Sequence, residues 1–183
     1  MPLTPAGYCA TCSRHAPRCT RTIAPLRFEP PCNRWVRRLK FHADFRVGSV
    51  LGDLLAQAVA DQLVPGSVPS LVIPVPLSGW RGFLRGFNQS VQLAAIVSRN
   101  VGIPMDCHLL RRVRHTPHQT GLARARRRRN VRGAFRATRQ LHGEHLALLD
   151  DVLTTGATLN ACTRTLLDAG AASVEWWVTQ RAV

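Results

Sequence analysis

The residues best suited to chemistry form one short segment near the C-terminal end of the chain. Asp150 and Asp151 follow an apolar run that starts at Leu146, and a turn over residues 154–158 comes before a helical pattern. The apolar run has the length of a buried parallel strand. A strand–turn–helix aims backbone N–H groups and the positive end of a helix at one point, which suits a phosphate group. The paired carboxylates suit sugar hydroxyls or a hydrated Mg²⁺ ion.

The turn itself contains the predicted phosphate ligands. Gly156 lets the backbone approach a ligand closely, the threonine hydroxyls add donors, and Thr158 is a good N-cap for the following helix. The full set of predicted phosphate ligands is Thr154, Thr155, Gly156, Ala157 and Thr158. An ordinary strand-to-helix connection with two accidental acids is the alternative. Other nucleotide motifs fit poorly, because the only lysine, Lys40, is far from any Walker A pattern and no G-x-G-x-x-G run occurs.

Several blocks of sequence together resemble a known family. An apolar strand, two acids and TTGAT resemble the phosphoribosyl-pyrophosphate (PRPP) loop of type I phosphoribosyltransferases. Upstream, residues 85–89 read RGFNQ, and GAF follows at residues 133–135. Between them lie Thr116, Gln119, Leu122, Arg127 and Asn130 in the spacing T-x-x-Q-x-x-L then R-x-x-N. This ordered set resembles the ComF/GntX family of phosphoribosyltransferase-like proteins, whose members are linked to DNA uptake in natural competence.

The resemblance implies a role for each block. Asp150 and Asp151 are expected as the catalytic pair, binding the ribose 2′- and 3′-hydroxyls and helping to place Mg²⁺, while the turn holds the 5′-phosphate. Arg81 and Arg85 are expected to bind pyrophosphate with their forked donors. Residues of a mobile loop that closes over PRPP are expected at Thr116, Gln119, Arg127 and Asn130.

A basic composition points to anionic partners. The 183 residues carry a formal net charge of +15, and no acidic residue occurs from Cys107 to Gly143. The arginines of that stretch have two interpretations: a loop that closes over phosphate, or a charged surface. Four consecutive arginines, residues 126–129, cannot all face one small ligand, so some are expected to meet nucleic-acid phosphates.

Four of the six cysteines lie within the first 32 residues. Cys9 and Cys12 have the spacing of half a zinc site, and the resembling family usually has two such pairs in an N-terminal zinc ribbon. Cys19, Cys32 or His15 are candidates to complete a partial Zn²⁺ site. The sequence leaves open whether zinc binds.

Alternating apolar and amphipathic segments predict an α/β fold of the type I phosphoribosyltransferase class, a mostly parallel twisted sheet with helices on both faces. We expect residues 1–31 to be an irregular, Cys-containing arm and residues 32–183 to be the phosphoribosyltransferase-like domain. With no apolar run long enough for a membrane span and no signal peptide, the expected location is cytoplasmic. The expected helices are residues 33–41, 45–63, 88–99 and 159–169; the expected strands are residues 71–75, 104–110, 131–138, 146–150 and 173–179.

Two functions of different classes follow. One is Mg²⁺-dependent transfer of the 5-phosphoribosyl group of PRPP to an unknown nitrogen acceptor, with loss of pyrophosphate. The alternative is a non-catalytic accessory of DNA uptake, which binds single-stranded DNA or the uptake machinery through its arginines and uses the PRPP site for binding or sensing alone.

Overall fold

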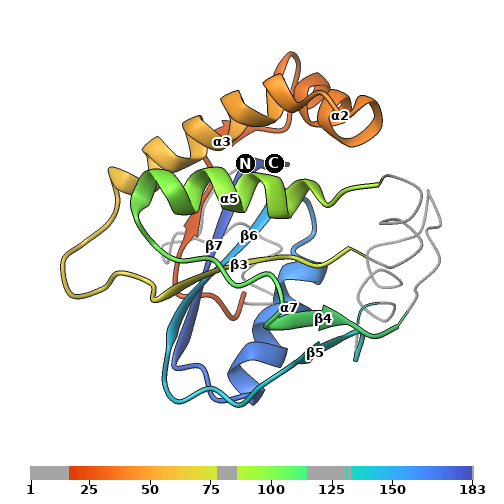
Figure 1. Cartoon of the computed structure of the whole chain (residues 1–183). Helices are drawn as coiled ribbons and strands as arrows, with labels where there is room; N and C mark the ends of the chain where they lie inside the picture. Colours follow the sequence, from red (N-terminus) through yellow and green to blue (C-terminus); the bar gives the residue numbers. More distant parts are fainter. Residues whose placement is uncertain (1–16, 78–85, 115–130, 132, 183) are drawn as a thin grey trace, which may run out of the picture.

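The computed structural model describes residues 17–77, 86–114, 131 and 133–182. Within these residues, five strands form one sheet in which every pair is parallel (Figure 1). The order across the sheet is β1 (Thr22–Ile23), β7 (Ser173–Arg181), β6 (His145–Leu153) and β3 (Leu71–Pro74), with β2 (Leu26–Arg27) also paired to β7. The predicted α/β fold with a mostly parallel sheet is confirmed.

Strands β6 and β7 form the centre of the sheet. Both are buried along most of their length, as expected for central parallel strands that are covered on both faces. Beside β6, strand β3 pairs Leu71 with Leu146 and Pro74 with Leu149. The Val75 amide continues this ladder by donating to the Leu149 carbonyl at 2.9 Å. The end of β3 therefore lies next to the start of the acidic pair.

Helices cover both faces of the sheet (Figure 1). One face carries α2 (Cys32–His42), α3 (Phe45–Ala60) and α5 (Gln89–Val101). The other face carries α7 (Ala157–Asp168) and an antiparallel pair, β4 (Leu110–Arg112) with β5 (Phe135–Ala137). Trp176 and Trp177 show the alternation of β7, because they are buried in the two hydrophobic cores on opposite faces.

The sequence located most elements but misplaced some of their ends. All four helices occur, and Asn88 caps α5 as predicted, its Oδ1 accepting from the Ser90 amide at 3.0 Å. The strand expected at residues 104–110 is wrong in position. Met105 makes an isolated bridge to Val72, and β4 begins only at Leu110. Strands β6 and β7 run further than expected, to Leu153 and Arg181.

Part of the segment expected to be irregular joins the sheet. Strands β1 and β2 each contain two residues and pair with β7. Such short strands carry no periodic signal of their own, so they form only because the exposed edge of β7 offers hydrogen-bond partners. Residues 1–16, with Cys9 and Cys12, lie outside the described part of the chain.

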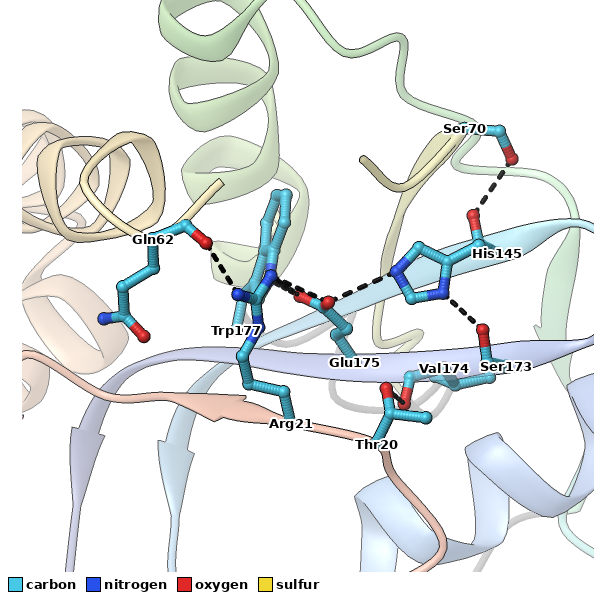
Figure 2. A network of polar contacts seen from close by, with 9 residues as sticks. All are labelled: Thr20, Arg21, Gln62, Ser70, His145, Ser173, Val174, Glu175 and Trp177. Carbon is cyan, nitrogen blue, oxygen red and sulfur yellow. Dashed lines mark hydrogen bonds and ion pairs between the residues drawn. The ribbon is translucent and has the colours of Figure 1, made fainter. Parts of the chain in front are cut away.

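A buried carboxylate fastens the N-terminal segment to the start of β7 (Figure 2). Glu175, 3% exposed, accepts from Arg21 Nη2 at 2.8 and 2.9 Å, one bond to each carboxylate oxygen. Trp177 Nε1 donates to the same carboxylate at 3.0 Å, and His145 Nε2 lies 3.2 Å from it. The His145 ring also contacts Ser173 through Nδ1. With so many partners, the buried charge is well compensated.

None of the helices within the described ranges has the length and apolar character needed to cross a lipid bilayer.

Candidate functional site

The acidic pair and the turn behind it lie at the carboxyl end of β6. Asp150 and Asp151 lie near the carboxyl end of β6, and α7 begins at Ala157 after a turn. Open parallel sheets bind ligands at this edge, beyond the carboxyl ends of their strands. The predicted strand–turn–helix is therefore present, and the edge that carries it is the one where ligands of such folds bind.

The start of α7 differs from the prediction. Gly156, with φ of +68°, occupies the N-cap position, and Thr158 lies inside the first turn of the helix. A glycine adopts this left-handed conformation without the steric cost of a Cβ atom, so the helix begins two residues earlier than Thr158 alone suggests. Thr155 Oγ1 accepts from the Ala157 amide at 3.4 Å. The first turn contains no acidic residue, so its positive end has no compensating carboxylate of its own.

Asp150 has an unusual environment. Its Oδ1 accepts from Ser90 Oγ and from the Asp151 amide, each at 2.9 Å. The pKa of Asp150 is raised to about 7, first because the surrounding protein removes water from the carboxyl and second because the charge of Asp151 is adjacent. Lys40 and the two hydrogen bonds oppose this shift without cancelling it. A carboxyl group with such a pKa changes its protonation near neutral pH.

Asp151 is the more buried member of the pair, with 3% of its surface exposed. Lys40 Nζ donates to its Oδ1 at 2.8 Å, and Gln89 Nε2 donates to its Oδ2 at 2.8 Å. Its backbone carbonyl accepts from Thr179 Oγ1 at 2.6 Å. Sequence reasoning missed these partners. Lys40 is 111 positions away in the chain, and the residues of the RGFNQ block gave no direct signal of a contact with the acids.

A cavity of about 380 Å³ joins these groups. Its walls include both acids, Thr154 and Thr158 from the turn, and residues 75–77 beyond β3. Of the described residues, three basic side chains also line it: Arg37 and Lys40 from α2, and Arg112 from β4. Arg112 also lies over the Phe135 ring, 5.3 Å from its centroid. The cavity thus combines acids, bases and a helix N-terminus, the set that a phosphorylated sugar requires.

A larger hollow of about 730 Å³ lies on the other side of α7, between this helix and β5. Neither Asp150 nor Asp151 lines it, and its walls alternate apolar residues with Arg18, Arg136 and Arg164. Size alone therefore does not identify the site. The paired carboxylates and the turn make the smaller cavity the candidate site.

The other candidate residues fall outside the part of the chain that the structure describes. These are Arg81, Arg85, Thr116, Gln119, Arg127, Asn130, Cys9 and Cys12. Their roles in binding pyrophosphate, closing over PRPP or holding zinc remain predictions. Among the described residues, no group of three or more His, Cys, Asp or Glu side chains could hold a metal ion.

Comparison with known proteins places the chain in a family. The family model for the phosphoribosyl transferase domain matches residues 88–181. DNA utilization protein YhgH of Salmonella typhi is 34% identical, over 98% of this chain and 82% of that protein. The chain belongs to the ComF/GntX family of phosphoribosyltransferase-like proteins. Competence protein F of Haemophilus influenzae is 33% identical to this ComF/GntX member, over 97% of this chain and 80% of that protein.

Solved structures similar to this ComF/GntX protein include an allosteric regulatory enzyme of purine biosynthesis. That likeness has a TM-score of 0.49 and 23% identity, over 72% of this chain and 26% of the other. The crystal structure of TT1426 from Thermus thermophilus gives a TM-score of 0.43 and 22% identity, over 72% of each chain.

Proposed function

We propose that the protein binds PRPP with Mg²⁺ and transfers its 5-phosphoribosyl group to a nitrogen acceptor, releasing pyrophosphate. The observation that carries this proposal is the cavity at the end of β6, where the acids and the turn meet. In this pose the 5′-phosphate lies against the start of α7, and the ribose ring lies over the acidic pair. The names of the relatives, DNA utilization protein and competence protein, support a cellular role in DNA uptake.

The chemistry depends on positioning and charge. Breaking the bond at C1 of the ribose leaves positive charge on the sugar and negative charge on the departing pyrophosphate. Amides and hydroxyls of residues 154–158 fix one end of the substrate, and basic groups on the cavity wall stabilise the charge that develops at the other end.

Mg²⁺ fits the donors that this cavity offers. Magnesium binds through one or two carboxylates together with waters and substrate phosphates, so a protein cage of three or more acids is not required. Within the described residues, Asp150 accepts two hydrogen bonds, both at Oδ1, which leaves Oδ2 for an ion or a hydroxyl. When bound, the ion supplies charge neutralisation for the leaving pyrophosphate.

Calorimetry with purified protein tests binding. Titration of PRPP in the presence of Mg²⁺ should release or absorb heat with a single saturating site, and Asp150→Ala should weaken it at least tenfold. Arg164→Ala, on the larger hollow, is the matched control and should bind as the wild type does. An absence of heat with folded wild-type protein at millimolar PRPP contradicts the proposal.

Turnover needs its own measurement, because a PRPP site can serve sensing alone. Incubation with PRPP, Mg²⁺ and a panel of nitrogenous bases should release pyrophosphate with one class of acceptor. If PRPP binds yet no acceptor gives turnover, the non-catalytic accessory is favoured. In that case single-stranded DNA should bind with an affinity that falls steeply with salt, as expected for arginine–phosphate contacts.

A further inference from the structure

The two carboxylates of the acidic pair are not equivalent. Both oxygens of Asp151 are occupied by side chains from two helices, Lys40 of α2 and Gln89 of α5. Asp151 also lines the cavity, but with 3% of its surface exposed and a side-chain donor on each oxygen it offers a sugar hydroxyl less room than Asp150 does.

Asp150 presents the opposite arrangement. Both of its hydrogen bonds end on Oδ1, and Oδ2 has no partner among the described residues. Its side chain lines the cavity beside Thr154 and Thr158. Of the two acids, Asp150 is therefore the better placed to accept from a ribose hydroxyl.

Lys40 is held where it can meet a ligand. An ammonium group has three donors, and Asp151 takes one of them at 2.8 Å. The Lys40 side chain is 23% exposed and lines the cavity next to Arg37, one helical turn earlier on α2. The start of the segment after β3, at Pro76 and Leu77, lies on the same cavity wall.

We propose that Lys40 binds the pyrophosphate group of PRPP, that Asp151 is the positioning residue that holds the Lys40 ammonium at the cavity wall, and that Asp150 is the main acceptor for the ribose hydroxyls. This inference rests on the proposed binding of PRPP. The ligand then lies between two electropositive ends, the start of α7 for the 5′-phosphate and the Lys40–Arg37 pair for the diphosphate. Asp150 lines the same cavity as both ends.

A purely structural ion pair between α2 and β6 is the competing explanation. The two explanations differ in which part of the ligand is affected by loss of Lys40. Ribose 5-phosphate lacks the diphosphate, and inorganic pyrophosphate lacks the sugar. A structural defect weakens all three ligands together, whereas loss of a pyrophosphate contact spares ribose 5-phosphate.

The experiment is calorimetry of wild type, K40M and K40R with three ligands in Mg²⁺: PRPP, pyrophosphate and ribose 5-phosphate. K40M should weaken PRPP and pyrophosphate about 10- to 100-fold, the value of one charge-assisted hydrogen bond, and should leave ribose 5-phosphate within about twofold. K40R should recover most of the lost affinity. R34M, an exposed arginine on the same helix that does not line the cavity, is the matched control and should match the wild type.

Loss of Lys40 leaves Asp151 buried without its cation, so K40M can destabilise the fold. The double variant K40M/D151N removes both charges and should regain the stability lost in K40M. It should still bind ribose 5-phosphate and still lack affinity for pyrophosphate.

Three outcomes overturn the inference while the wild type binds PRPP. One is unchanged pyrophosphate binding in K40M, another is equal weakening of all three ligands, and the third is restored pyrophosphate binding in the double variant. Failure of the wild type to bind PRPP is a separate result, which removes the proposed function itself.

Discussion

Replacing Asp150 with asparagine should change how the stability of the protein depends on pH. The folded pKa of Asp150 is about 7, against an ordinary value of 3.8 for an aspartic acid. Between these values the unfolded chain has lost the proton and the folded chain has kept it, so the folded state binds more protons. The free energy of unfolding must therefore fall as pH rises through this window. The stabilising contribution of protonated Asp150 to the free energy of unfolding is complete below the unfolded-state pKa and is lost above the folded-state pKa.

The magnitude follows from the separation of the two pKa values. Each pKa unit corresponds to about 1.4 kcal/mol, so a difference of about three units sets an upper limit near 4 kcal/mol. Asp150 borders the cavity, and part of its pKa shift comes from the neighbouring Asp151. For both reasons we expect a free-energy difference smaller than this limit. We expect D150N to be more stable than the wild type by about 1–2 kcal/mol at pH 8 and equal to it near pH 4. An asparagine keeps an oxygen acceptor for Ser90 and the Asp151 amide, so geometry should be preserved.

Urea unfolding at pH 4, 5, 6, 7 and 8 measures this difference directly. Other titrating groups are common to both proteins, so the difference between the two pH profiles isolates Asp150. D53N is the control, because Asp53 is an exposed carboxylate on α3 that accepts from Asn100. Its profile should run parallel to that of the wild type. The reasoning is refuted if D150N and the wild type show the same pH slope, or if the wild type gains stability relative to D150N as pH rises.

Three further substitutions test how the fold holds the site. R21A leaves the buried Glu175 carboxylate with fewer donors and should lower the free energy of unfolding, measured in urea, by about 2–4 kcal/mol. R27A, at an exposed position of β2, is the control and should have a much smaller effect. Equal effects of the two substitutions would contradict a stabilising role of the Arg21–Glu175 ion pair. G156A forces a Cβ onto a φ of +68°, so it should cost about 1 kcal/mol and weaken PRPP binding; unaltered stability and affinity would show that the turn tolerates a side chain. G52A puts a Cβ about 2.8 Å from the Ile96 side chain and should cost about 1–3 kcal/mol, and most of this loss should vanish with I96A alongside it.

Local chemistry explains why some of the site was predictable from the sequence. The β6–turn–α7 unit is encoded within neighbouring residues: an apolar run, two acids, a glycine and a helical pattern. Amphipathic periodicity likewise located α3 and α5, and the Asn88 cap was recognisable because an asparagine precedes an apolar helical pattern. The fold class followed from the alternation of such units.

The remaining features depend on contacts between distant parts of the chain. Lys40 meets Asp151 across 111 positions, and no periodicity or spacing records that pairing. Strands of two residues, such as β1, are too short to show a pattern. The first turn of α7 was misplaced because Thr158 is a good cap in isolation, yet the positive φ of Gly156 starts the helix earlier. Tertiary geometry decides each of these cases.

The two ends of the central strands indicate how the protein divides stability from binding. At the start of β7, Glu175 is buried, but Arg21, Trp177 and His145 surround its carboxylate. At the far end of β6, Asp150 is left with an oxygen that has no described partner and with a raised pKa. The incompletely paired carboxyl of Asp150 lowers the stability of the folded state. A binding site can retain such an unfavourable group when a ligand supplies the missing partner, so the carboxyl end of β6 is where we expect the substrate to bind.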